Sequence, residues 1–333
     1  SKRLINNNLL VTAGLRIDGN NYNSNTSNPL RQFSPRISFS YSVTEKDVIN
    51  IGVGRYFQQA AYTTLGFRNN AGELVNKDGA GFIGVNHYNL GAEHRFSEAI
   101  LFSVEGFYKD YFQYPIDLIN NVSLANHGAD YSSVAGAAPV SFTGEVRAVG
   151  FEVLSRINLR EFNFIGSYTF VRSLFTDLDG EYIPSSWDSR HLLTLTGSKA
   201  FKNNWRVGFK WRFVGGLPYT PYDLQTSANI QAWDAKGQPY LDFTQLNSLR
   251  FSSFHQLDLR VDKNFFFNKW ALMVYIDIQN VYNFKSNGQD YIIREKNPDG
   301  SYKTTNNGQD YVLERIPNES GTVLPTLGIM IKL

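Results

Sequence analysis

Histidine and serine are the residue types in this chain that could support catalysis or bind a metal, and their spacing argues against both. The five histidines occur in no His-Glu-x-x-His or comparable ligand spacing; they are His87, His94, His127, His191 and His255. His191 and Ser198 would lie about 23 Å apart in one strand and on opposite faces, so they cannot act as base and nucleophile. We expect no catalytic residue, no cofactor and no metal centre.

One acidic segment resembles part of a calcium-binding loop. Asp177 and Asp179 are followed by Gly180, but the later ligands of such a loop are missing. A plain turn is the favoured interpretation. Cysteine is absent, which removes thiolate ligands, disulfides and cysteine nucleophiles together.

Charged residues recur at alternate positions in several segments that otherwise look apolar. Charges cost several kcal/mol at the midplane of a bilayer, so these residues must face a lumen or another part of the protein. Because neighbouring segments carry opposite signs, the favoured interpretation is a structural network of salt bridges rather than substrate contact. The predicted lumen-facing residues are Glu152, Arg156, Lys210, Arg212, Asp258, Arg260, Asp262 and Asp277.

A second polar group is predicted where one strand begins. Asp188, Arg190 and His191 follow a polar loop, and an arginine can form a forked pair with a carboxylate. We expect a structural polar cluster at the outer rim, in preference to a substrate contact.

The composition limits the class of protein. The chain has 333 residues with 32 Lys plus Arg and 30 Asp plus Glu, and it contains no basic run that would bind nucleic acid. No run of about 18 apolar residues is present, so no membrane-spanning helix is expected. Aromatic residues make up 15% although the mean hydropathy is mildly negative. Such a composition is typical of a barrel with a lipid-facing apolar band and a wet interior.

Alternation of apolar and polar residues predicts the elements that carry these groups. Leu257, Leu259 and Val261 would share one face of a strand, and Asp258 and Arg260 the other. About twelve such strands are predicted, at 8–18, 35–44, 48–58, 83–95, 100–112, 145–157, 161–174, 188–200, 205–215, 253–265, 269–283 and 323–333.

The connections between these strands alternate between short turns and long loops. The long ones span about 19–34, 59–82, 113–144, 175–187, 216–252 and 284–322, and the last is expected to protrude as a hairpin with a turn at Asn297–Gly300. Aromatic residues flank both ends of the strands, as in the two girdles of a membrane barrel. The fold class is therefore an all-β, antiparallel, up-and-down transmembrane β-barrel.

An ordered series of short motifs resembles the barrel of TonB-dependent receptors. The most distinctive are Ser186-Trp-Asp-Ser-Arg-His191 and Gly216-Leu-Pro-Tyr-Thr-Pro221. Others are Ser34–Tyr41 with Gly52–Phe57, Tyr88–Phe96 with Gly106–Asp110, Arg147–Val153, Asp258–Lys263, Asp277–Asn283 and Leu324–Ile329. The style is that of Bacteroidota members with a carboxypeptidase-regulatory-like N-terminal domain.

This resemblance implies a 22-stranded barrel around an N-terminal plug, located in the outer membrane. It implies import of a scarce nutrient with energy from the TonB complex. The implied partners are membrane lipid, the plug and remaining barrel strands, the TonB complex and a surface lipoprotein. The chain departs from the family in having no plug or TonB box, and in ending on Leu333 instead of an aromatic residue. It begins without a leader, so we expect that a leader was removed or that the chain is the C-terminal part of a longer precursor.

Two alternatives remain open on the sequence. One is a self-closed barrel of about twelve strands that acts as a passive channel or a surface enzyme. The other is a surface adhesion or scaffold protein whose loops, especially 216–252 and 284–322, bind a partner.

Overall fold

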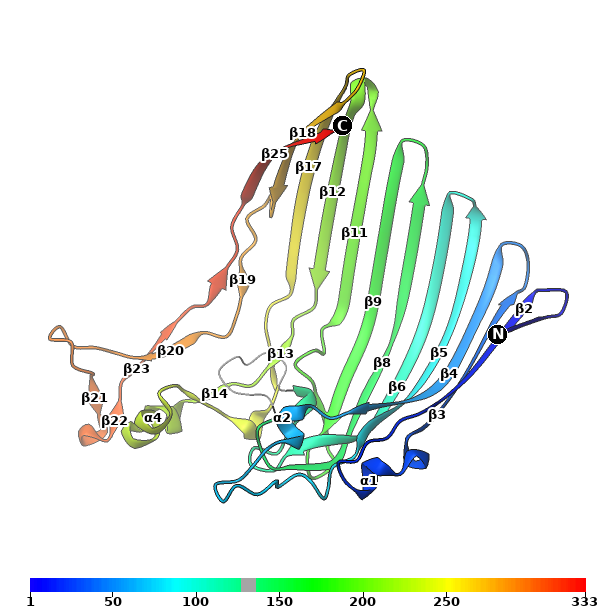
Figure 1. The fold of residues 1–333 in the computed structure, drawn as a ribbon. Helices are drawn as coiled ribbons and strands as arrows, with labels where there is room; N and C mark the ends of the chain where they lie inside the picture. Colours follow the sequence, from blue (N-terminus) through cyan, green and yellow to red (C-terminus); the bar gives the residue numbers. More distant parts are fainter. Residues whose placement is uncertain (127–135) are drawn as a thin grey trace.

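A computed structural model shows one large antiparallel sheet with all its long loops at one end. The structure describes residues 1–126 and 136–333. Figure 1 shows the strands running from short turns at the top to loops and short helices at the bottom. We call these two ends the short-turn end and the long-loop end.

Twelve long strands follow one another in chain order across the sheet. They are β2 (Leu9–Ile17), β3 (Phe33–Ser42), β4 (Asp47–Gln59), β5 (Phe82–Ser97), β6 (Ile100–Asp117), β8 (Val140–Asn158), β9 (Phe162–Thr176), β11 (Arg190–Phe201), β12 (Trp205–Val214), β17 (Phe254–Phe266), β18 (Ala271–Gln279) and β25 (Leu324–Lys332). Each pairs with the next in antiparallel register, which confirms the predicted up-and-down topology.

Three differences from the predicted strands have local causes. A short first strand, β1 (Lys2–Leu4), pairs with β2, and its three residues are too few to show alternation. β6 and β8 extend beyond the predicted limits through irregular register near Tyr114. β18 ends at Gln279 rather than at residue 283, because Asn280 and Asn283 adopt the left-handed conformation, with φ of 53° and 55°.

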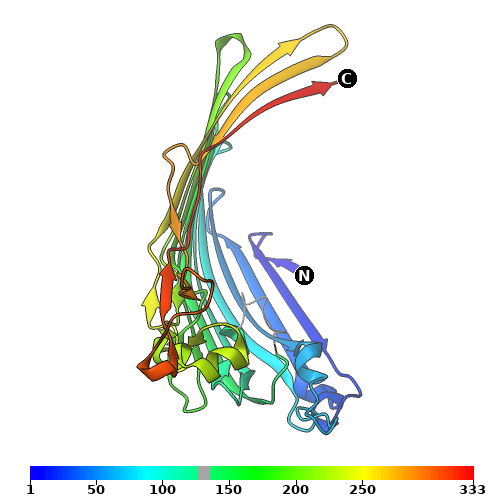
Figure 2. The ribbon, with the colours of Figure 1, turned by 90° about the vertical axis from the view of Figure 1, so that its left-hand side faces the viewer.

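The sheet is curved but not closed. Figure 2 shows the sheet bending into an open arc, with the two chain ends on separate edges. Among the described strands, β1 and β25 are the end members, and they do not pair with each other. The self-closed twelve-stranded barrel is therefore not the arrangement of this chain.

The long loops carry small elements of their own. The first loops contain α1 (Ser24–Ser27) and α2 (Tyr62–Leu65), and the 215–253 loop contains α3 (Leu224–Ala228) and α4 (Ile230–Lys236). The expected hairpin of the last loop is present as β19 (Ser286–Asn287) with β24 (Glu319–Ser320), β20 (Tyr291–Arg294) with β23 (Leu313–Ile316), and β21 (Thr304–Thr305) with β22 (Asp310–Tyr311). The remaining short strands are β7 (Val122–Ser123), β10 (Tyr182–Pro184), β13 (Pro218–Tyr219), β14 (Tyr222–Asp223), β15 (Tyr240–Leu241) and β16 (Leu249–Arg250).

Candidate functional site: the polar face and the long-loop rim

The register of the ladder assigns every side chain of the sheet to one of two faces. Residues directly opposite one another on paired strands share a face, and the face changes at each residue. Lys210 lies opposite Asp258, and Arg260 lies opposite Asp277. We call the face that carries these residues the polar face. Leu259, opposite Ile278, belongs to the other, which we call the apolar face.

All eight residues predicted to face a lumen fall on the polar face. The ladder links Arg156 to Ile165, then to Thr196 and Lys210, and Glu152 lies opposite Thr169 on the same side. Arg212 and Asp262 follow by alternation from Lys210 and Asp258. The structure thus groups these charges on one surface, although four strands lie between the first residue, on β8, and the last, on β18.

Only part of the predicted salt-bridge network forms. Arg212 lies 3.6 Å from Asp258, and Arg260 lies 2.8 Å from Asp262. The Arg260 guanidinium also lies 3.9 Å from the centre of the Tyr275 ring. Within the described residues the other members form no ion pair; they are Glu152, Arg156, Lys210 and Asp277. Glu152 lies opposite Glu105, so two carboxylates face each other there and cannot form an ion pair.

Two hollows lie on the polar face and indicate which side of the sheet is concave. One, of about 360 Å³, is lined by Thr12, Ser38, Gly52 and Asn89 among others. The second, of about 240 Å³, is lined by residues that include Arg206, Asp262 and Met273. Neither hollow is enclosed.

The apolar face exposes large side chains between rows of aromatic residues. Ile276 is 47% exposed and Ile329 70% exposed, values expected of a surface covered by something other than water. Near the long loops, Phe57 and Phe112 pack edge to face with ring centres 5.8 Å apart. Near the short turns, Trp205 and Phe265 are exposed on the same face. This pattern matches the two girdles expected from the sequence.

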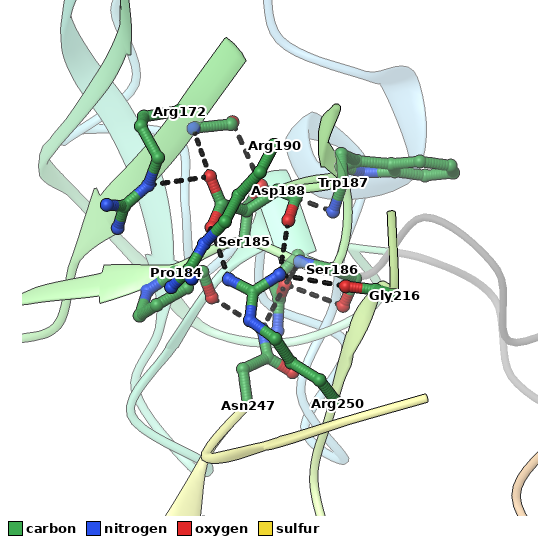
Figure 3. A network of polar contacts seen from close by, with 12 residues as sticks. Arg172, Pro184, Ser185, Ser186, Trp187, Asp188, Arg190, Gly216, Asn247 and Arg250 are labelled. Carbon is green, nitrogen blue, oxygen red and sulfur yellow. Dashed lines mark hydrogen bonds and ion pairs between the residues drawn. The ribbon is translucent and has the colours of Figure 1, made fainter. Parts of the chain in front are cut away.

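Asp188 is the centre of a polar network at the long-loop rim, which we call the Asp188 hub. Its side chain is fully buried. Oδ1 accepts hydrogen bonds from Arg172 Nε at 3.1 Å and from the backbone N–H of Ser173 at 2.8 Å. Oδ2 accepts from an Arg250 guanidinium nitrogen at 2.5 Å. Figure 3 shows these donors converging on the carboxylate from separate segments.

Arg250 joins two loops through this carboxylate. Its second guanidinium nitrogen donates to the backbone oxygens of Asp188 at 2.6 Å and Gly216 at 2.9 Å. A Cβ at Gly216 would lie 1.9 Å from the carbonyl oxygen of Phe251, so only glycine allows the two segments to approach this closely. The network therefore fixes the loop after β12 against the loop before β11.

The expected cluster of Asp188, Arg190 and His191 forms only in part. Arg190 has a left-handed backbone with φ of 62°, and its Nε lies 3.8 Å from Asp188 Oδ2. The expected forked pair is absent, and the short contact to the carboxylate comes from one guanidinium nitrogen of Arg250 instead. His191 lies on the apolar face, where Nδ1 is 2.9 Å from the Tyr168 hydroxyl and the ring is 5.4 Å from that of Phe170. His191 is thus part of the aromatic row and not of the hub.

Asn126 and Asn247 extend the hub to a third loop. Asn126 Oδ1 accepts from the backbone N–H of Ser186 at 2.7 Å and from Asn247 Nδ2 at 2.9 Å. Asn247 also donates to the carbonyl oxygen of Pro184 at 2.7 Å. Sequence reasoning missed Arg172, Arg250, Asn126 and Asn247. The Gly215-Gly216 pair, which permits close backbone approach, was the available signal.

A separate unit forms where the last loop meets α3 and α4. Trp233 is buried, and the Arg294 guanidinium lies 3.3 Å from Asp234 and 3.7 Å from the centre of the Tyr302 ring. Asp223 caps α3, and the hydrogen bond from the Thr226 hydroxyl lowers the pKa of this carboxyl. These contacts explain how a hairpin that projects from the sheet is held in place.

The described residues contain no group of three or more His, Cys, Asp or Glu positioned to hold a metal. His127 lies outside them, as does part of the predicted 113–144 loop. None of the described helices is both long enough and apolar enough to cross a membrane. Asp177 Oδ1 accepts hydrogen bonds from the backbone N–H groups of Asp179 and Glu181, which is the expected plain turn.

The comparison with protein families decides the class. The model for "TonB dependent receptor-like, beta-barrel" matches residues 3–281. The chain belongs to the TonB-dependent receptor β-barrel family. This family comprises outer-membrane receptors and transporters of Gram-negative bacteria, and its members are not enzymes. The comparison with curated proteins gives no match.

Solved structures of TonB-dependent receptors share the fold at low sequence identity. The ferripyoverdine receptor of the outer membrane of Pseudomonas aeruginosa is 15% identical with a TM-score of 0.53, covering 77% of this chain and 30% of the receptor. The ferric-catecholate import receptor Fiu from K12 E. coli is 16% identical with a TM-score of 0.53, covering 90% of this chain and 35% of Fiu. The ferric citrate transporter FecA is 16% identical with a TM-score of 0.54, covering 90% and 38%. The chain therefore spans about a third of the length of these TonB-dependent receptors.

Proposed function

We propose that this chain forms the C-terminal part of the barrel of a TonB-dependent transporter that imports a scarce nutrient across the outer membrane. The observation that carries the proposal is the open, twelve-strand half-barrel of a chain that belongs to this family. An unpaired strand edge in lipid leaves backbone N–H and C=O groups without partners. The edges at β1 and β25 are therefore completed by further strands, up to the 22 that the resemblance implies.

The two faces of the sheet take different roles in this proposal. The apolar face contacts membrane lipid, and the polar face, with Glu152, Lys210 and Asp277, lines the lumen around the plug. Charges without partners in the sheet, such as Arg156, are available to pair with the plug. The short turns lie on the periplasmic side, where the TonB complex acts, and the Asp188 hub lies at the outer rim as a structural support for the loops.

The outer loops form the receptor surface. On the β20–β23 hairpin, Tyr291 lies opposite Ile316, and both are exposed together with Ile293. They supply an apolar surface for the surface lipoprotein that the resemblance implies. The motif style supports a source among the Bacteroidota. A transporter rather than an enzyme is also supported by the family.

Two measurements test this function. Solute depletion from the medium is compared for the wild-type host, a strain lacking this receptor and a strain lacking TonB. A solute whose uptake requires both proteins is expected. Uptake that requires the receptor but persists without TonB would instead indicate a passive channel.

The second measurement concerns the barrel. Cysteines at Leu15, on the part of β2 that β1 does not cover, and at Leu327 on β25 are introduced into the otherwise cysteine-free chain, and the mass of the native polypeptide is determined. We expect no disulfide between them and a polypeptide roughly three times this length. Efficient crosslinking within a 333-residue mature chain would contradict the half-barrel.

A further inference from the structure

Two lysines interrupt the apolar face near the short turns of β11, β12 and β17. Lys199 lies opposite Phe162 on β9 and Val207 on β12. Lys263 lies opposite Trp205 on β12 and Val274 on β18. Because all these neighbours are apolar, both ammonium groups project from the surface that the fold presents to lipid.

Aromatic rings lie close to both ammonium groups. Lys199 Nζ is 5.4 Å from the centre of the Phe201 ring, and Lys263 Nζ is 5.0 Å from the Trp205 ring and 5.5 Å from the Phe265 ring. Phe201 is 50% exposed, Trp205 45% and Phe265 41%. Lys263 also donates to the backbone oxygen of Asn203, which leaves two of its three N–H groups for another acceptor.

Neither lysine has a carboxylate partner among the described residues, in contrast to charges elsewhere on the same face. Near the long loops, Arg147 lies 3.5 Å from Asp110 and 3.6 Å from Glu145. At the short turns of β4 and β5, His94 lies 2.6 Å from Asp47. The β11–β18 segment instead adds Lys202 and Lys269 in its turns, so positive charge accumulates there.

We propose that Lys199, Lys263 and Trp205 form a binding site for the phosphate headgroup of an anionic phospholipid in the leaflet at the short-turn end. This proposal rests on the proposed function, because it requires the apolar face to lie in a membrane. The two lysines are two strands and two residues apart, about 12 Å, with Trp205 between them. Lysine stems lie along apolar surface while their ammonium groups reach the headgroup level. The phosphate therefore binds next to the aromatic rings of Trp205, Phe201 and Phe265, and the acyl chains of the lipid lie along Val207 and Val274.

The test uses the full receptor that contains this chain, reconstituted with equal amounts of phosphatidylglycerol and phosphatidylethanolamine and released for native mass spectrometry. We expect the wild-type receptor to retain phosphatidylglycerol in preference. Each lysine near anionic headgroups contributes a factor of about five, so the Lys199→Gln, Lys263→Gln double variant loses roughly tenfold or more of this preference. The Lys199→Arg, Lys263→Arg variant keeps it, because the positive charges remain.

Lys332→Gln is the matched control, since it removes a positive charge at the same end of the sheet but from the polar face. It is expected to leave the lipid preference unchanged. An unchanged preference in the Gln double variant, or equal loss in the Lys332 control, overturns the site. Displacement of the retained lipid by millimolar inorganic phosphate would also overturn it, in favour of a free-phosphate site. Each variant is first shown to insert into membranes as a heat-modifiable barrel. Failure of the wild-type receptor to insert would count against the proposed function. Unchanged lipid preference in an inserted Gln double variant would count against the lipid site alone.

Discussion

The sheet and the outer loops are built by opposite means. In the sheet, each strand pairs with its neighbour in the chain, and side chains divide between the two faces with a period of two. In the loops, buried polar side chains bridge distant segments. Asn247 bonds to Asn126, 121 residues away, and Arg250 bonds to Asp188, 62 residues away. The sheet is thus specified by local pattern, and the loop arrangement depends on a few long-range polar contacts.

The largest expected effect comes from removing the charge at the centre of the hub. Asp188→Asn leaves the guanidinium groups of Arg172 and Arg250 without their buried carboxylate. Breaking one partner of such a network destabilises by about 3–5 kcal/mol. Hydrogen exchange should show loss of protection in the loops before β11 and after β12, while protection in the sheet is retained.

Arg190→Gln is the control for this comparison. Arg190 is 45% exposed and lies 3.8 Å from the carboxylate, so its loss should cost less than about 1 kcal/mol. Equal effects of the Asp188 and Arg190 variants would show that the hub does not depend on the buried carboxylate.

A smaller effect is expected from a charge placed on the apolar face of the sheet. Leu259→Lys puts an ammonium group near the middle of the proposed lipid-facing band, at a cost of about 2–4 kcal/mol. Gln256→Lys, on the polar face of the same strand, should cost little. The folded fraction after assembly into vesicles, read from heat modifiability on a gel, checks both. A larger loss for Gln256→Lys would mean that the two faces are assigned the wrong way round.

The smallest effect concerns pH and the cap of α3. The Thr226 hydroxyl lowers the folded-state pKa of Asp223, so this carboxylate contributes stability above its ordinary pKa of about 3.9, and the contribution is lost as the pH falls through the lowered value. Asp223→Ala should cost about 1 kcal/mol at neutral pH and less once the wild-type carboxyl is protonated, because a neutral carboxyl accepts the capping hydrogen bonds more weakly. Proteolysis rates within α3 and α4, compared at pH 7 and below pH 3, measure this. A difference between variant and wild type that does not shrink as the pH falls would exclude the carboxylate charge as its cause.

The same contrast explains what could be predicted from the sequence. Strands such as β17 alternate polar and apolar residues, here from Gln256 to Asp262, so their existence, faces and order follow from local pattern. Asp188 could be recognised as a rim residue from its position before a strand. Its partner Arg250 could not, because a loop side chain that lies 62 residues away carries no periodic signal. Arg190 is nearer to Asp188 in sequence, but its backbone is left-handed. The short contact to Asp188 comes instead from Arg250, in the loop after β12.

The division of the sheet into a lipid-facing and a lumen-facing side is the central claim, and β17 offers its most direct test. Single cysteines are placed at each position from Gln256 to Lys263 in this cysteine-free chain and carry a nitroxide spin label in the full receptor in membranes. Collision with dissolved oxygen, which concentrates in lipid, should be high at residues 257, 259 and 261 and low at residues 256, 258, 260 and 262. Oxygen accessibility that alternates with a period of two and has these maxima supports the assignment of the two faces. The test works even where the plug shields the lumen from water-soluble reagents. Maxima at the even positions, or no alternation along the strand, would contradict it.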